Sequence, residues 1–97
     1  MTRQRRIAHY EAQLRRVNGA CAALEQALAR FRAARSAAEE LDAYYGGDLW
    51  RGDLAADEAG LLPEGLRRGV LSEDGAYNAL EEYRHRQALL NAMEEKE

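Results

Sequence analysis

The chain has 97 residues, of which 46% are hydrophobic, and a formal net charge of −3 at pH 7. This composition suits one small folded domain and argues against wholesale disorder. The first twenty residues contain no apolar run, no segment resembles a membrane span, and Cys21 is the only cysteine, so we expect a cytoplasmic protein without a signal peptide, an intramolecular disulfide or a cysteine metal cluster.

Charge is distributed unevenly. Residues 1–36 carry eight arginines against two acids, a balance of +6, whereas residues 37–97 carry six basic residues against fifteen acids, a balance of −9. Such asymmetry fits a nucleic-acid-binding arm, and it also fits two halves that lie against each other or against a second copy. The arginines have no interleaved aromatic residues for base stacking, which favours the second interpretation.

A long helix is predicted over residues 3–45. Its apolar residues recur at alternating intervals of three and four, the a and d positions of a heptad pattern. Alanines next to this seam widen it, which suits a helical bundle. The seam residues are Ile7, Tyr10, Leu14, Val17, Cys21, Leu24, Leu28 and Phe31.

The pair Asn18-Gly19 is a possible interruption, because this dipeptide is typical of turns. Val17 and Cys21 nevertheless keep the heptad in phase across it. We predict that the helix continues through Gly19, and a helix break there is the alternative.

After Phe31 the next seam position is Arg35, and the seam then resumes as far as Tyr45. Gly46 and Gly47 follow at once, and glycine is the usual residue just past a helix end. The long helix is therefore expected to end near Tyr45.

The connector, residues 46–71, is predicted to fold as short helical turns that pack on the helices. Asp53 is a candidate N-cap for a turn that Gly60 ends, and Pro63 is placed to begin a second turn that Gly69 ends. Apolar residues for this packing are Leu54, Leu61, Leu62, Leu66, Val70 and Leu71.

A second helix is predicted over residues 73–95. Ser72 is a good N-cap, and Glu73 and Asp74 place negative charge on the first turn. Gly75 stands where a capping box would have Glu or Gln, so that motif is incomplete. One stripe of this helix comprises Ala76, Leu80, Tyr83, Gln87 and Leu90, flanked by Tyr77, Ala79, Leu89 and Met93.

The lengths of the two helices predict self-association. At the usual rise per residue the first would be about 60 Å long and the second about 35 Å. An antiparallel hairpin of the two leaves part of the first helix uncovered. We therefore expect an all-α fold, a long antiparallel hairpin that pairs into a dimeric four-helix bundle. The candidate self-association seam is Ile7, Tyr10, Leu14, Val17, Cys21 and Leu24.

We predict no catalytic, metal or cofactor site. The connector acids do not follow the pattern of a calcium-binding loop, and capping explains them without an ion. The histidines lie on different predicted helices, and no serine stands in a nucleophile-elbow pattern. The residues considered are Asp48, Asp53, Asp57, Glu58, His9, His85, Ser36 and Ser72.

An aromatic cluster at the end of the first helix is the stronger candidate site. Trp, Tyr and Arg are the residue types favoured at binding hot spots. The alternative is that Trp50 and Tyr45 anchor the connector in the core. The candidate partner-binding residues are Tyr44, Tyr45, Trp50, Arg67, Arg68, Glu73 and Asp74.

The segments "RIAHYEAQL" and "YYGGDLWRGDLAADEAGLLPEGLRRGVLSEDGAYNAL" resemble the bacterial family catalogued as domain of unknown function 4298, and the similarity runs from about Arg6 to Met93. The resemblance implies a small, mostly helical bacterial cytoplasmic protein, and it carries no activity, cofactor or catalytic residue. The family's recurring positions map to Tyr45, Trp50, Asp53, Asp57, Glu58, Gly60, Pro63, Arg68, Gly69 and residues 71–74.

From these features we expect a non-enzymatic protein–protein interaction or adaptor module that forms a homodimer. The alternative is a nucleic-acid-binding accessory protein that uses the arginines of the first helix. A ligand-binding or enzymatic domain that uses the connector carboxylates ranks third.

Overall fold

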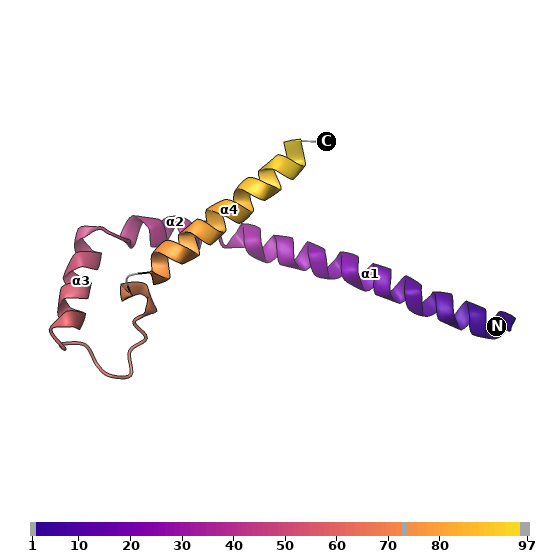
Figure 1. The fold of residues 1–97 in the computed structure, drawn as a ribbon, viewed down its shortest axis with the longest axis horizontal. Coiled ribbons are helices and arrows are strands. Elements are labelled where there is room, and N and C mark those ends of the chain that lie inside the picture. The colour runs from indigo at the N-terminus through magenta and orange to yellow at the C-terminus, as the bar shows by residue number, and fades with distance from the viewer. Residues whose placement is uncertain (1, 73, 96–97) are drawn as a thin grey trace. The chain divides into compact units, whose positions relative to one another are not determined.

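The computed structural model describes residues 2–72 and 74–95, and every element in them is helical (Figure 1). The elements are α1 (Arg3–Ala33), α2 (Arg35–Tyr44), α3 (Asp48–Glu58), the 3₁₀ helix η1 (Gly69–Leu71) and α4 (Gly75–Glu95). The all-α class is therefore confirmed. The chain divides at the Arg35–Ser36 junction into two compact units.

The first unit is essentially the helix α1. The hydroxyl of Thr2 accepts a hydrogen bond from the backbone N–H of Arg5 at 3.2 Å and caps the first turn. The helix runs without a break through Asn18 and Gly19, so its predicted continuity at that point is confirmed. Its 31 residues correspond to a length of about 46 Å.

The prediction of one helix over residues 3–45 is wrong at Ala34, which separates α1 from α2. Ala34 has φ −74° and ψ −7°, and its N–H is shared between the carbonyls of Arg30 and Phe31 at 3.1 and 3.2 Å. This is the tightened last turn of a helix end. Arg35 follows at a seam position where an apolar residue would have continued the stripe. The apolar face that would favour one continuous helix is therefore interrupted at this point.

The end of α2 agrees with the expected glycine stop. Tyr45 donates its N–H to the Leu41 carbonyl at 2.9 Å, and Gly46 then takes φ +78°. A side chain other than glycine is strained in that left-handed conformation. The extended backbone of Gly47 (ψ 179°) leads directly into α3.

The start of α3 corrects the sequence prediction for Asp53. That residue was expected to cap a short turn, but it lies inside an 11-residue helix that begins at Asp48. Asp48 supplies the negative charge of the first turn, where it interacts favourably with the helix dipole. It also pairs with Arg51 one turn later at 3.4 Å.

The predicted stop at Gly60 is confirmed. Gly60 has φ +72° and donates its N–H to the Asp57 carbonyl at 3.0 Å, and Leu61 donates to the Ala56 carbonyl at 3.0 Å. These two bonds form a Schellman motif, which satisfies carbonyls that the end of a helix leaves without partners.

The segment between α3 and η1 contains less helix than expected. Pro63 begins a single turn, in which its carbonyl accepts the N–H of Leu66 at 3.2 Å. Gly69 begins η1 and does not end a longer helical turn. The prediction of a helical turn from Pro63 to Gly69 is therefore wrong.

Ser72 links η1 to α4. Its hydroxyl donates to the Gly69 carbonyl at 2.7 Å and accepts from the N–H of Gly75 at 3.0 Å. The second bond is the one expected of an N-cap residue, so the capping role predicted for Ser72 is confirmed. Glu73, which was assigned to the first turn, lies outside the described residues.

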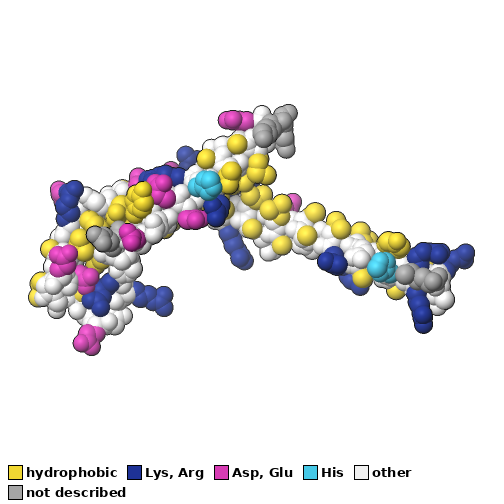
Figure 2. All heavy atoms as spheres, viewed as in Figure 1, with side chains coloured by type: hydrophobic (Ala, Val, Ile, Leu, Met, Phe, Trp, Pro, Cys, Tyr) yellow, Lys and Arg dark blue, Asp and Glu magenta, His cyan; other side chains and the backbone are white. Residues whose placement is uncertain are grey.

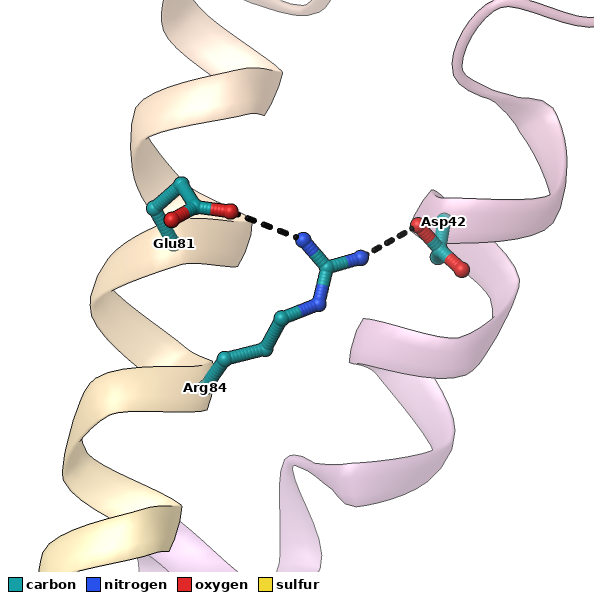
Figure 3. Close-up of polar contacts among 3 residues, drawn as sticks. All are labelled: Asp42, Glu81 and Arg84. Atoms are coloured by element: carbon teal, nitrogen blue, oxygen red, sulfur yellow. Dashed lines mark hydrogen bonds and ion pairs between the residues drawn. The ribbon is translucent and has the colours of Figure 1, made fainter.

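The core of the second unit is small. Leu71, Ala76 and Leu80 are its buried residues, with 3% to 7% of their surface exposed. η1 contacts both α3 and α4. Beside this core, Arg84 of α4 reaches Asp42 of α2 at 2.7 Å and Glu81 of its own helix at 3.2 Å (Figure 3). α2, α3, η1 and α4 therefore form one packed body.

Candidate protein-interaction surfaces

Trp50 joins α3 to η1. Its indole N–H donates to the Val70 carbonyl at 3.0 Å, and its ring meets that of Tyr45 edge to face, with centroids 5.1 Å apart and planes at 73°. Edge-to-face contact is a favoured geometry for aromatic pairs. The side chain is half-buried. Trp50 thus has an anchoring role, and part of its surface remains open to solvent.

Tyr44 connects the end of α2 to the middle of α3. Its hydroxyl donates to Asp53 at 2.6 Å. This hydrogen bond to the carboxylate raises the pKa of Tyr44, with desolvation and the negative charge of Asp53 as smaller causes, because each of them favours the protonated phenol. Asp53 therefore accepts a side-chain hydrogen bond from within α3, a role different from the N-cap role that the sequence predicted.

Arg68 attaches the segment before η1 to α3. Its guanidinium lies 2.7 Å from the carboxylate of Asp57, whose side chain is only 24% exposed. A partly buried ion pair of this kind is screened less by salt than a fully exposed one. Arg68, which the sequence marked as a partner-binding candidate, is therefore already engaged within the chain.

The remaining partner-binding candidates among the described residues are Arg67 and Asp74. Arg67 is exposed, and Asp74 is an exposed turn residue whose carbonyl accepts the N–H of Asn78 at 2.8 Å. The structure thus brings together Tyr44, Tyr45, Trp50 and Arg68 around α3. Among the described residues, the side chains of Arg67 and Asp74 form no hydrogen bond or ion pair with that cluster.

A hollow of about 440 Å³ opens beside Trp50. Its walls combine aromatic, aliphatic and acidic side chains from the end of α2, from α3 and from η1. We call it the Trp50 hollow, and its lining residues are Tyr45, Trp50, Leu54, Glu58 and Leu71. Glu58 is one of the connector acids noted in the sequence. Its place beside the aromatic residues could not be predicted, because it depends on α3 beginning at Asp48, earlier than the sequence indicated.

The seam of α1 is exposed in the first unit. Ile7, Tyr10, Leu14, Val17 and Leu24 each have between 53% and 62% of their surface exposed, and Cys21 is exposed with them. Hydrophobic side chains lie along this helix, and arginines gather at its N-terminal end (Figure 2). Large apolar residues exposed at regular spacing are typical of an interaction surface.

Within residues 2–72 and 74–95, no three His, Cys, Asp or Glu side chains are grouped so that they could hold a metal ion. In the same part of the chain, no helix combines the length and the apolar content needed to cross a membrane.

Comparison with known proteins gives a family and no function. No curated protein and no solved structure matches the chain. Residues 7–95 match the family described as Domain of unknown function (DUF4298). This match covers nearly the whole chain, including the α1 seam and every residue of the Trp50 hollow, and we conclude that the protein belongs to the DUF4298 family.

Proposed function

We propose that the protein is a non-enzymatic interaction module that dimerises through α1 and presents its second unit to another protein. The observation that carries the proposal is the exposed seam of α1, in which five large apolar residues are more than half exposed. Isolated helices are marginally stable in water, and most helical stability in proteins comes from packing of an apolar face. A second copy of α1 supplies such a face.

An antiparallel pair uses the whole seam. The eight seam positions are symmetric about the point midway between Val17 and Cys21, so reversing the second copy pairs every position with another. Leu14 of one copy then lies opposite Leu24 of the other, and the other layers are Ile7 with Phe31, Tyr10 with Leu28, and Val17 with Cys21.

A parallel pair would be packed less evenly, because it stacks Tyr10 on Tyr10, Phe31 on Phe31 and Cys21 on Cys21. Cores favour large residues opposite smaller ones, since this fills space without voids or strain. The antiparallel arrangement places each aromatic residue opposite an aliphatic one. Ala20 and Ala27 flank the seam and allow the two helices a close approach.

Arginines bound the seam at both ends. Arg3 and Arg35 occupy the next heptad positions before Ile7 and after Phe31. A charged side chain is costly to remove from water, so the apolar overlap extends over the eight positions and no farther. Leu89 and Met93 of α4, 49% and 66% exposed, supply further apolar surface for the four-helix bundle that we propose for the dimer.

Nucleic acid is the alternative partner, because α1 carries most of the arginines. An apolar seam is not what a phosphate backbone recognises, since affinity for nucleic acid comes largely from neutralised phosphates. Binding to a random DNA duplex that falls steeply with added salt would favour this alternative.

The test of the proposed dimer is the mass in solution at micromolar concentration. We expect about twice the 10.9 kDa of one chain by sedimentation equilibrium. Leu14→Glu places a charge in the seam and should give a monomer, because burying an unpaired carboxylate opposes association. Gln26→Glu adds the same charge on the outer face of α1 and should leave the dimer intact.

Two results would count against this function. One is a monomeric mass for the unmodified chain. The other is an equal effect of Leu14→Glu and Gln26→Glu, which would mean that the seam is not the contact.

A further inference from the structure

The acids of α3 differ in whether they have partners. Asp48 pairs with Arg51, Asp53 accepts from Tyr44, and Asp57 pairs with Arg68. In the part of the chain that the structure describes, Glu58 has no such hydrogen bond or ion pair. Glu58 is also the acid that lines the Trp50 hollow.

The rest of the hollow offers aromatic and aliphatic surface. The N–H of Trp50 is already bonded to Val70, so its indole ring can offer a ligand only a π surface. The rim therefore combines a carboxylate with two aromatic rings, and Leu54 and Leu71 complete the apolar part of the wall.

An arginine side chain matches each part of this surface. Its methylene stem packs on leucine, its guanidinium stacks on an aromatic ring, and the same guanidinium donates to a carboxylate. Arginine fits better than lysine, because its planar group stacks and forms two-pronged bonds. The balance of −9 over residues 37–97 favours a cationic partner over a phosphate.

We infer that the Trp50 hollow binds an arginine side chain presented by an apolar segment of another protein, with its guanidinium between the aromatic rings and Glu58. This inference rests on the proposed role of the second unit as a partner-binding surface, and it does not require the dimer.

Trp50 is the only tryptophan of the chain, so its fluorescence reports directly on this hollow. The probe is the peptide acetyl-Leu-Arg-Leu-amide, and its control replaces arginine with citrulline, which has nearly the same shape but no charge. We expect a saturable change in Trp50 emission with the arginine peptide and an affinity at least about tenfold higher than for the citrulline peptide, since a tenfold change corresponds to about 1.4 kcal/mol.

The matched variants are Glu58→Gln and Glu64→Gln. Glu64 is an exposed acid that does not line the hollow. Glu58→Gln should reduce the preference for arginine over citrulline, because only the attraction of the aromatic rings for the guanidinium is then left, and Glu64→Gln should leave the preference unchanged. Equal affinity for the two peptides, an absence of saturable change, or a preference that is as large in Glu58→Gln as in the unmodified chain would overturn the inference.

The same titration in the Leu14→Glu background separates this inference from the dimer. Arginine-selective binding that persists in a monomer supports the hollow on its own. A dimer that shows no selectivity supports the seam and refutes the hollow.

Discussion

Gly75 shows how one residue sets the junction between η1 and α4. A Cβ atom at this position would clash with the carbonyl oxygen of Gly69 and lie 2.5 Å from the hydroxyl of Ser72. The Ser72 hydroxyl donates to that carbonyl and accepts from the N–H of Gly75, so both oxygens belong to the link between η1 and α4. The capping box is incomplete at Gly75 because no larger residue fits against this carbonyl.

Replacing Gly75 with alanine is therefore expected to destabilise the second unit by about 2–3 kcal/mol, as overpacking against a rigid backbone does. Urea unfolding followed by Trp50 fluorescence measures this cost. Gly19→Ala is the matched control, because nothing lies within 4 Å of a Cβ there. It should stabilise α1 by about 0.5–1 kcal/mol through helix propensity, as measured by far-UV circular dichroism. If Gly75→Ala left the free energy of unfolding unchanged, the junction would be able to accommodate a Cβ atom, and the clash would not matter for stability.

At the scale of elements, the sequence predicts those helix boundaries that a glycine stop or a side-chain cap marks, as at Gly46, Gly60 and Ser72. The stops at Gly46 and Gly60 follow from a backbone conformation that glycine adopts most easily. The start of α3 at Asp48 was missed because Gly47 precedes it with no side-chain cap. The break at Ala34 was missed because it is a single residue long and α2 begins directly after it. The charged Arg35 at a seam position is the feature of the sequence that indicates an interruption there.

The contact between α3 and η1 includes a hydrogen bond that no sequence pattern predicts, from the indole N–H of Trp50 to the Val70 carbonyl. Trp50→Phe keeps a ring beside Tyr45 but leaves the Val70 carbonyl without its donor. We expect a loss of about 1 kcal/mol in the free energy of unfolding, the usual net contribution of a hydrogen bond. Thermal unfolding followed by circular dichroism measures it.

Tyr45→Phe is the control for Trp50→Phe. It retains the aromatic contact, and the described residues give the Tyr45 hydroxyl no hydrogen bond, so its stability should be nearly unchanged. If the two variants were equally destabilised, ring packing and not the indole N–H would hold α3 to η1.

At the scale of the whole molecule, the heptad pattern correctly predicted a continuous helix as far as Phe31. In the second unit, the buried residues Ala76 and Leu80 lie on the predicted stripe of α4. The Trp50 hollow was not predictable in the same way. Its walls come from residues 45 to 71, which meet through hydrogen bonds and side-chain packing and through no periodic pattern. The aromatic residues suggested a site, and the carboxylate beside them is known only from the fold.

The antiparallel pairing of α1 makes a geometric prediction. Leu14 of one copy lies opposite Leu24 of the other, whereas the two copies of Leu14 lie ten residues apart along the axis, about 15 Å. A disulfide requires Cα atoms within about 7 Å. Cross-linking can therefore distinguish the two orientations.

The most direct measurement is disulfide formation between two variants, both carrying Cys21→Ala, of which one has Leu14→Cys and the other Leu24→Cys. They are mixed, oxidised under mild conditions and identified by mass spectrometry. The antiparallel seam predicts a disulfide between Leu14→Cys and Leu24→Cys chains, with neither variant cross-linking to itself. Disulfides between like chains, or no cross-link in the mixture, would contradict it.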